Sequence, residues 1–401
     1  MKWPRQPARV RAPATSANLG PGFDALGLAL ALYDEVEARV TSGGLALEVS
    51  GEGGGTAAVG ERHLVVRAMR AAFAAVGGQP PGIALRCANA IPHGRGLGSS
   101  AAAICAGLLA ARDLAGPAGE RLPDEALFQL AVALEGHPDN VAACLSGGLT
   151  IAWTPAAGGG VADGAGPGAR LLKVPVPATL RAVACVPAAP LDTEAARQAL
   201  PAAVPHADAA ANAARSALLI AALTGAPQLL FEATEDFLHQ PYRAAIMPET
   251  ARLLGALRRA GAAAVVSGAG PAVLVLSFEG QGPPAEAVDS IARETGIAWH
   301  VTPLHIDQQG AHVQQGGPGV HPPVSARREP SENQVRGPGA GRAGGSRRDR
   351  ASSLRDTQAT GEGMPWALLV LSGMPHQVPR RGDRCSPVIC CAPGHTAGRS
   401  R

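Results

Sequence analysis

The chain has 401 residues, of which 46% are hydrophobic, 17% charged and 3% aromatic, so it can form two or three domains with largely aliphatic cores. The net charge of +3 conceals an asymmetry, because residues 308–401 hold 13 arginines against 6 acidic residues and leave residues 1–307 net acidic. The body therefore lacks the basic stripe of a nucleic-acid-binding protein, and no apolar stretch is long enough to span a membrane. The N-terminal sequence MKWPRQPARV lacks the apolar segment of a signal peptide.

The seven cysteines favour a reducing compartment. Cys87, Cys105, Cys144 and Cys185 are scattered through apolar segments, which is typical of buried free thiols in a cytosolic protein. The other three lie near the C-terminus and match no metal-binding motif. We therefore expect a cytoplasmic protein.

The first part of the chain alternates between strand and helix patterns. Short alternating or apolar runs broken by Gly, Pro or Asp predict strands, and apolar residues at helical spacing predict helices. The predicted elements are strands within 8–50 (at 9–14, 26–33, 35–40 and 45–50), a helix at 61–76, a strand at 82–88, and helices at 99–114 and 123–134.

The second part has the same mixture, with a helix-rich middle. The predicted elements are strands at 149–153 and 171–186 around a Gly-rich loop at 156–168, helices at 193–200, 207–224, 226–238 and 249–260, strands at 262–268 and 272–278, a helix near 284–295 and a strand at 297–304. Strands and helices mixed in both parts predict an α+β protein with two lobes. We place the domains at 1–155 and 156–307.

Residues 308–401 are rich in Gly, Pro and Arg and predict a disordered, low-complexity tail. The apolar run at 366–371 is too short to form a core. An Arg-rich arm for nucleic acid is one interpretation of this tail, and linker-like sequence without a selected role is the one that we favour.

Residues 91–103, IPHGRGLGSSAAA, predict an anion-binding loop at the start of a helix. The three glycines permit a ligand to approach the backbone, and the helix presents unpaired N–H groups and the positive end of its dipole. Ser99 and Ser100 can donate to phosphate or offer oxygen to Mg²⁺. The loop lacks the lysine of a Walker sequence, so backbone dipoles and a metal ion would supply the positive charge. The alternative is an ordinary strand–turn–helix joint.

Residues 135–149, EGHPDNVAACLSGGL, offer a second set of polar groups. Glu135 closes an apolar helix, and a carboxylate paired with a serine hydroxyl would suffice for nucleotide-bound Mg²⁺. Asp139 and Asn140 can recognise an ammonium or hydroxyl group. Taken alone, the stretch is more simply a helix-capping aspartate in a turn, followed by a glycine bend.

Two further stretches combine small polar residues with glycine. Residues 12–27, APATSANLGPGFDALG, place Asp24 among apolar neighbours, where a carboxylate is costly unless it meets a cation. That cation is either an internal arginine or a ligand ammonium group. Residues 267–276, SGAGPAVLVL, predict a Gly-rich turn between two strands, which is either a tight turn or a place where backbone approaches a ligand.

In their order along the chain, the stretches at 12–27, 91–103 and 267–276 resemble the three signature motifs of the GHMP kinase superfamily. The loop is similar to the pattern P-x-x-x-G-L-G-S-S, while SANLGPGFDALG and EGHPDNVA resemble the homoserine kinases, as do residues 191–201 and 239–248. The resemblance covers residues 8 to about 305. It implies a two-lobed GHMP kinase fold, with an N-terminal lobe like ribosomal protein S5 domain 2 and a ferredoxin-like C-terminal lobe.

The resemblance implies transfer of the γ-phosphoryl group of ATP to the hydroxyl of L-homoserine, a step toward threonine, with Mg²⁺ as cofactor. It also favours a homodimer. The triphosphate would contact nine loop residues, namely Pro92, Gly94, Arg95, Gly96, Leu97, Gly98, Ser99, Ser100 and Ala101. Ser100 and Glu135 would hold Mg²⁺, and Asn140 would act beside them without being a strong base.

The resemblance assigns the substrate to both lobes. Homoserine would contact Asn18, Asp24, Asp139, Thr193, Arg197, Arg243, Gly268 and Gly270. The carboxylates would face its ammonium group, and the two guanidinium groups would bind its carboxylate, because a planar guanidinium suits two-point contacts.

Two features depart from the family, and two alternatives stay open. His63 stands where the family usually has an Asn near the nucleotide base, so nucleotide selectivity is undecided, and residues 308–401 have no family counterpart. The chain could be another GHMP kinase that acts on a mevalonate-type or sugar substrate, or a non-catalytic sensor. Arg197 and Arg243 favour an amino-acid substrate, and the intact loop argues against the sensor.

Overall fold

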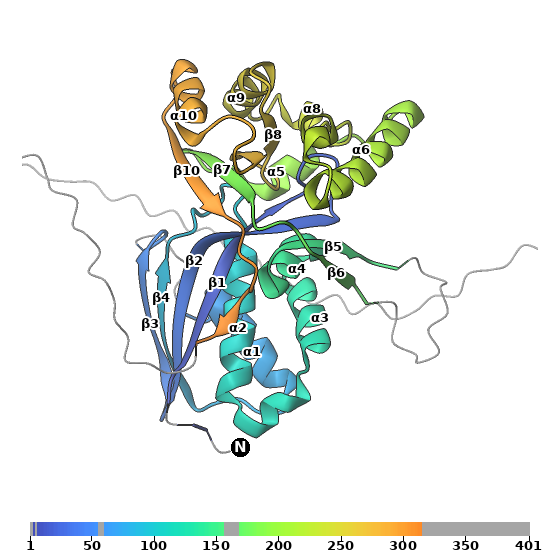
Figure 1. Ribbon diagram of the computed structural model, residues 1–401. Helices are drawn as coiled ribbons and strands as arrows, with labels where there is room; N and C mark the ends of the chain where they lie inside the picture. The colour runs from blue at the N-terminus through green and yellow to red at the C-terminus, as the bar shows by residue number, and fades with distance from the viewer. Residues whose placement is uncertain (1–2, 5, 55–59, 156–167, 315–401) are drawn as a thin grey trace, which may run out of the picture. The chain divides into compact units, whose positions relative to one another are not determined.

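The computed structural model describes residues 3–4, 6–54, 60–155 and 168–314. In these ranges the chain forms two β-sheets, each accompanied by helices, as Figure 1 shows. This confirms the predicted two-lobed α+β fold. No helix in the described ranges is long and apolar enough to cross a membrane.

The first sheet is built around one long strand, β2. Its strands are β1 (Ala8–Ala17), β2 (Leu26–Thr41), β3 (Gly44–Gly51), β4 (Gly82–Asn89), β5 (Leu149–Trp153), β6 (Arg170–Val174) and β11 (His312–Val313). β2 pairs with β1, with β4 through residues 35–41 and with β5 through residues 26–28. The strands predicted at 26–33 and 35–40 are therefore one strand. Asp34 does not break it, because its buried carboxylate accepts hydrogen bonds from the backbone N–H groups of Ala90 and Ile91.

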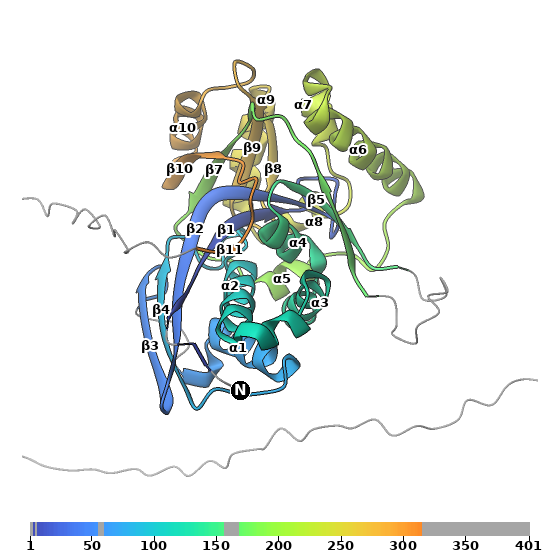
Figure 2. The same cartoon turned by 60° about the horizontal axis from the view of Figure 1, so that its bottom comes forward.

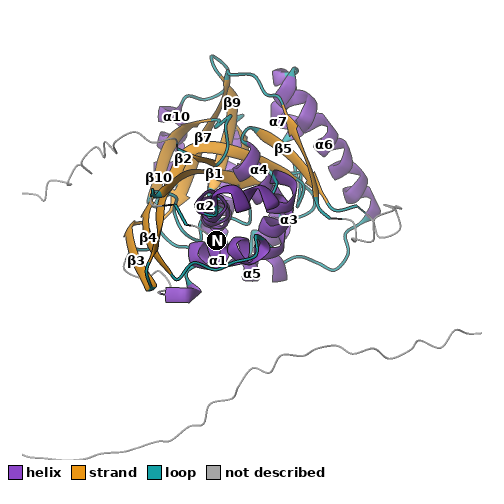
Figure 3. Ribbon diagram, turned by 90° about the horizontal axis from the view of Figure 1, so that it is seen from below, coloured by secondary structure: helices purple, strands orange, loops and turns teal. Residues whose placement is uncertain are grey.

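Helices of the first lobe gather on one face of this sheet, as Figure 3 shows from below. They are α1 (Leu64–Ala75), α2 (Ser99–Leu114), α3 (Asp124–Glu135) and α4 (Pro138–Ser146), with 3₁₀ helices at Gly60–Arg62 and Gly116–Arg121. α2 is buried on nearly all sides, and it contacts α1, α3, α4 and the sheet. Its alanine-rich sequence lets these neighbours approach closely.

The second sheet has the connectivity predicted for a ferredoxin-like lobe. Its strands are β7 (Leu180–Pro187), β8 (Ala263–Val266), β9 (Val273–Phe278) and β10 (Trp299–His305). They lie in the order β10-β7-β9-β8, and all pairs are antiparallel. Helices connect β7 to β8 and β9 to β10, and Figure 2 shows α9 and α10 beside this sheet.

The helices of the second lobe are α5 (Thr193–Gln198), α6 (His206–Thr224), α7 (Leu230–Ala233), α8 (Gln240–Arg243), α9 (Pro248–Arg259) and α10 (Ala285–Glu294), with a 3₁₀ helix at Pro227–Leu229. α9 and α10 form a small core with one face of the sheet, which includes Val275 and Leu257. Residues of the other face, among them Ala182, Val265 and Leu274, belong to the core of the first lobe. The two lobes therefore share one apolar interior.

After β10 the chain returns to the first sheet. β11 pairs antiparallel with β1, and the Tyr33 hydroxyl of β2 donates to Asp307 Oδ2 at 2.9 Å. The other oxygen of Asp307 accepts the N–H groups of Gln309 and Gly310. His312 and Val313, which the sequence assigns to the tail, thus extend the first sheet. Residues 315–401 of the predicted tail, and residues 156–167 of the Gly-rich loop predicted at 156–168, lie outside the described residues.

Two local predictions were wrong. The helix predicted at 226–238 ends at Ala233, because the Asp236 carboxylate accepts N–H groups of residues 238–240 and replaces helical hydrogen bonds there. Residues 138–146 form helix α4, although the sequence favoured a turn. Pro138 occupies the first turn of that helix, where its missing N–H has no cost.

Candidate active site

The anion-binding loop, predicted within residues 91–103, lies between β4 and α2, as expected. Gly96 and Gly98 have φ values of 77° and 69°. A Cβ at Gly96 would lie 2.2 Å from the carbonyl oxygen of Ser267, and one at Gly98 would lie 1.9 Å from Thr15 Oγ1, so only glycine fits at these positions. No side chain caps the start of α2. The first N–H groups of the helix are therefore available to an anion.

A cavity of about 250 Å³ opens at this loop. It brings together residues from both lobes and from all the predicted motifs. The predicted site residues that line it are Asn18, Asp24, Gly94, Gly96, Gly98, Ser99, Ser100, Glu135, Asp139, Asn140, Thr193, Arg197, Arg243 and Gly268.

Five predicted residues do not border the cavity, namely Pro92, Arg95, Leu97, Ala101 and Gly270. Leu97 and Ala101 are buried in the core of the first lobe. Gly270 packs against Met247, where a Cβ would lie 2.7 Å from the sulfur. The side chains of Leu97 and Ala101 thus have packing roles, and the ligand contacts of all five residues stay predictions.

Arg95 connects the loop to the second lobe. Its guanidinium donates to the backbone carbonyls of His93, Pro187 and Ala188 at 2.9, 3.0 and 2.6 Å. It also lies 3.9 Å from the Glu52 carboxylate. These bonds use three of the five N–H groups of the guanidinium and hold it against the second lobe, and the predicted phosphate contact stays a prediction.

Ser100 and Glu135 form the acidic side of the cavity. Ser100 lies in the first turn of α2, Glu135 is the last residue of α3, and the Ser100 hydroxyl donates to Glu135 Oε2 at 2.5 Å. Burial raises the pKa of Glu135, and the nearby charge of Asp139 adds to this, whereas the Ser100 hydrogen bond and His137 act in the opposite direction. A bound cation would favour the charged form of this carboxylate.

The pair fits Mg²⁺ only as part of a larger ligand set. No group of three or more His, Cys, Asp or Glu side chains in the described part of the chain could hold a metal ion. One carboxylate and one hydroxyl are hard oxygen ligands of the kind that Mg²⁺ takes when phosphates and water complete its octahedron. The donor set therefore suits a metal ion that arrives with a nucleotide.

Helix α4 and the residue before it, His137, place three polar residues on the cavity. Asp139 Oδ1 accepts the N–H of Asn140 at 2.7 Å and lies 2.6 Å from His137 Nδ1. Burial alone would lower the pKa of His137, but the hydrogen bond and charge of Asp139, with the charge of Glu135, give a net increase. Thr15 Oγ1 donates to Asn140 Oδ1 at 2.8 Å, so the amide nitrogen of Asn140 is the group left for a ligand.

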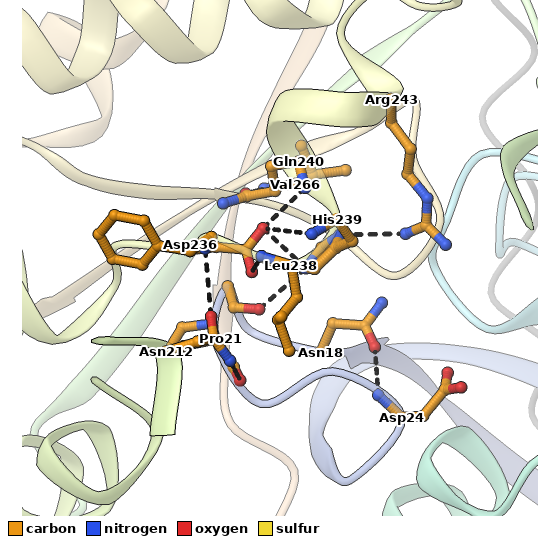
Figure 4. Close-up of polar contacts among 12 residues, drawn as sticks. Asn18, Pro21, Asp24, Asn212, Asp236, Leu238, His239, Gln240, Arg243 and Val266 are labelled. Atoms are coloured by element: carbon orange, nitrogen blue, oxygen red, sulfur yellow. Dashed lines mark hydrogen bonds and ion pairs between the residues drawn. The ribbon is translucent and has the colours of Figure 1, made fainter. Parts of the chain in front are cut away.

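The first motif adopts a strained loop that Asn18 holds. Asn18 and Asp24 have φ values of 68° and 52°, in the region that non-glycine residues avoid. Asn18 donates to the carbonyl of Gly268 at 2.8 Å and accepts the N–H of Asp24 at 2.9 Å, and Figure 4 shows the second of these bonds. Its amide is thus engaged in holding Asp24. The cation that the sequence required for Asp24 is Arg197, with N–O distances of 3.1 and 3.3 Å.

Arg243 is 2% exposed, yet no carboxylate of the described residues pairs with it. Its guanidinium donates to the carbonyl of Ala196 and lies 5.6 Å from the ring centroid of Phe23. Burial lowers its pKa, and the positive charge of Arg197 lowers it further. Two cations that repel each other beside one cavity favour an anion between them.

Ser267 joins the three signature motifs. Its hydroxyl donates to the carbonyl of Gly96 at 2.6 Å and lies 2.8 Å from Ser16 Oγ, while the next residue, Gly268, donates its N–H to Ala17. The sequence predicts no ligand contact for Ser267, Thr15, His137 or His239. The groups that contact Thr15 and Ser267 lie 125 to 251 positions away along the chain, so no local pattern indicates these contacts. His137 and His239 also have near partners, since Asp139 follows His137 by two positions and Arg243 follows His239 by four.

Comparisons with known proteins match both lobes of the chain. The family model "GHMP kinases N terminal domain" matches residues 63–148, and "GHMP kinases C terminal" matches residues 208–298. The homoserine kinase of Streptomyces coelicolor is 52% identical over 305 residues, covering 76% of this chain and 94% of the relative. That of Clavibacter michiganensis is 49% identical over 307 residues, covering 76% and 93%.

Solved structures give the same result. The crystal structure of homoserine kinase from Cytophaga hutchinsonii matches with a TM-score of 0.65 and 28% identity, covering 78% of this chain and 99% of that one. A structure of a putative homoserine kinase from Listeria monocytogenes matches with a TM-score of 0.59 and 28% identity, covering 77% and 100%.

Proposed function

The chain belongs to the GHMP kinase superfamily and, within it, to the homoserine kinase family, and on that premise we propose that it transfers the γ-phosphoryl group of ATP to the hydroxyl of L-homoserine. The product is O-phospho-L-homoserine, and the enzyme is a phosphotransferase of threonine biosynthesis. The observation that carries the proposal is one cavity that joins an anion-binding helix start to a set of amino-acid-binding charges.

The phosphate side of the cavity consists of the loop, the start of α2 and the pair Ser100–Glu135. Backbone N–H groups and the helix dipole attract the triphosphate without a lysine. Ser100 and Glu135 would hold Mg²⁺, which when bound neutralises charge on the phosphates. Phosphoryl transfer depends chiefly on alignment and charge neutralisation, which the loop, the start of α2 and the pair Ser100–Glu135 would provide.

The substrate side carries charges that match an amino acid. Asp24 and Asp139 are suited to an ammonium group, and Arg197 and Arg243 are suited to a carboxylate. Asp24 and Arg197 contact each other, so substrate binding would exchange one ion pair for two, with the ammonium taking Asp24 and the carboxylate taking Arg197. The two guanidinium groups explain why a carboxylate-bearing substrate suits this site better than a sugar.

Asn140 is the residue that we assign to positioning the substrate hydroxyl. Thr15 fixes the oxygen of its amide, which leaves the nitrogen to donate to the hydroxyl oxygen. We assign no strong base, and the hydroxyl proton passes to phosphate or solvent as the O–P bond forms.

The test is ADP release by the full chain with homoserine, mevalonate and galactose as acceptors. We expect homoserine-dependent turnover that requires Mg²⁺, and little or none with the other two. Turnover with mevalonate or galactose, and none with homoserine, would contradict the proposed activity and indicate another GHMP kinase. The absence of turnover with every acceptor would support a non-catalytic sensor.

We further infer a cytoplasmic homodimer from the family to which the chain belongs. Sedimentation of the purified full chain would report its mass in solution. A monomer at micromolar concentration would remove the dimer from the proposal without affecting the reaction.

A further inference from the structure

We propose that His239 is a positioning residue, which holds the guanidinium of Arg243 toward the cavity so that it can bind the substrate carboxylate. The proposal rests on the function proposed above, in which Arg243 contacts that carboxylate. His239 itself does not border the cavity, so any effect on the substrate must pass through another residue.

The contacts of His239 fix the position of its proton. The imidazole Nε2 lies 2.8 Å from the carbonyl oxygen of Gly20, which can only accept a hydrogen bond, so Nε2 carries hydrogen. The imidazole Nδ1 lies 3.1 Å from Nη1 of Arg243, which can only donate, so Nδ1 has a free lone pair. His239 is therefore neutral, with hydrogen on Nε2, and it accepts a hydrogen bond from Arg243. Figure 4 shows this contact.

Burial supports the same protonation state. The side chain of His239 is fully buried, and this burial lowers its pKa, as does the charge of Arg243, whereas the charges of Asp236 and Asp24 raise it. Asp236 is the nearest carboxylate, at 3.5 Å from Nε2. Its oxygens already accept three backbone N–H groups, from residues 238–240, which reduces its pull on the imidazole.

Few other contacts orient Arg243. Its Nε donates to the carbonyl of Ala196 at 3.0 Å, and Nη1 has one further contact, with the carbonyl of Gly268, at 3.4 Å. Without the lone pair of His239, Nη1 would keep only this long bond. His239 thus provides the main acceptor on that side of the guanidinium.

The neutral state of His239 matters for the chemistry. A carboxylate in its place would orient Arg243 equally well, but it would also neutralise the arginine and compete with the substrate. A neutral acceptor fixes the direction of the N–H groups and leaves the positive charge for an incoming anion. The ring also stacks on Phe23, 5.3 Å away between centroids, and so connects Arg243 to the loop of the first motif.

The experiment compares three variants of the full chain, namely His239→Ala, His239→Asn and His239→Gln. An Asn amide can place an acceptor near the position of Nδ1, whereas a Gln amide reaches the position of Nε2. We expect His239→Ala to raise the KM for homoserine by about 10- to 100-fold, as for loss of a hydrogen bond to a charged group. The kcat and the KM for ATP should change less than about twofold. His239→Asn should restore most of the affinity, and His239→Gln should not.

A second acceptor makes the test specific for the carboxylate. The wild type and the variants are compared with 2-amino-1,4-butanediol, in which a hydroxymethyl group replaces that carboxylate. The penalty of His239→Ala should disappear with this analogue. Gln240→Ala is the matched control, since it removes a part-buried acceptor of the Val266 N–H from the same turn and removes no contact of the Arg243 side chain. It should leave the KM for homoserine unchanged.

The outcomes separate this inference from the function on which it rests. A wild type without homoserine-dependent turnover contradicts the proposed function. An active wild type contradicts the inference about His239 in three cases: the homoserine KM is unchanged in His239→Ala, the penalty is equal with the analogue, or His239→Gln restores affinity and His239→Asn does not. If His239→Ala fails to fold, the homoserine KM values of His239→Asn and His239→Gln, which both keep a polar side chain, still test the inference.

Discussion

Asp24 and Arg197 form a two-point ion pair, with Nη2–Oδ1 at 3.1 Å and Nη1–Oδ2 at 3.3 Å, between a loop of the first lobe and helix α5 of the second. They are separated by 173 positions in the sequence. We assign Asp24 to the ammonium group of the substrate and Arg197 to its carboxylate. Without substrate, these two side chains therefore form an ion pair with each other.

Arg197→Lys should raise the KM for homoserine by about 10- to 100-fold, because lysine keeps the charge but loses the two-point contact with a carboxylate. Steady-state kinetics check this, with Arg215→Lys as the control. Arg215 pairs with Glu235 at 2.8 Å with similar exposure, away from the cavity. Equal effects of the two substitutions would contradict the assignment of Arg197 to the substrate.

Glu135→Gln should lower kcat by about 100-fold or more, because the charge stabilisation by a metal ion is worth several kcal/mol. The same change should stabilise the protein at pH 7 by about 0.5–2 kcal/mol. The folded-state pKa of Glu135 is raised, so its contribution to stability is largest below its unfolded pKa and falls as pH rises through the folded pKa. Urea melts at pH 4 to 8 measure this, and the gain should shrink toward pH 4. Glu125→Gln, on an exposed position of the same helix, should show no gain.

Gly98→Ala should destabilise the chain by more than the 1–2 kcal/mol of a left-handed alanine, since its Cβ would also meet Thr15 at 1.9 Å. Gly44→Ala is the matched control, with φ 76° and no heavy atom within 4 Å of the added Cβ. Urea melts of both variants separate strain from steric contact. The double variant Gly98→Ala/Thr15→Ala should recover part of the difference, and equal losses in Gly98→Ala and Gly44→Ala would contradict the contact.

Asn140→Ala should lower kcat by about 10- to 100-fold with little change in the KM for homoserine, because positioning of the hydroxyl matters most at the transition state. Thr15→Val, which removes the hydroxyl that orients Asn140, should give a smaller loss in the same parameter. The two losses should not add in the double variant. Unaltered turnover in Asn140→Ala would remove this residue from the mechanism.

Tyr33→Phe should cost about 1 kcal/mol at pH 8, through loss of the hydrogen bond to Asp307. Burial, with the hydrogen bond and charge of Asp307, raises the pKa of Tyr33 to about 12, above its ordinary value of 10. The contribution is therefore complete below pH 10 and is lost as pH rises to about 12. Denaturant melts of both proteins should converge over that interval, and comparison with the wild type cancels Cys87 and Cys185, whose pKa is also about 12. A constant difference from pH 8 to 12 would be inconsistent with this account.

Local chemistry made part of the fold predictable. Helix α2 begins at Ser99 and ends at Leu114, as the glycine-to-alanine transition and its apolar run indicated. Helix α4 escaped prediction because Pro138 fits the first turn of a helix as well as it fits a bend. The first residues of that helix are polar, so no helical spacing of apolar residues distinguished a helix from a bend there.

Most residues that the sequence predicted for the site border one cavity, but the sequence did not predict the contacts among them. The sequence required a cation for Asp24 without distinguishing an arginine from a ligand, because a local pattern reports burial and not the partner. For Arg95 the sequence pointed to a ligand instead of a protein partner. Its place in the loop predicted a phosphate contact, while its guanidinium donates to backbone carbonyls of the second lobe. Only the tertiary arrangement decides such cases.

Strand β11 also determines how far the polypeptide can be trimmed. His312 and Val313 cover the outer edge of β1, and the N–H of Gln314 donates to the carbonyl of Arg9. A fragment that stops at residue 310 would expose this edge to other copies, and unprotected sheet edges promote aggregation. A catalytic fragment that does not aggregate should therefore end no earlier than Gln314.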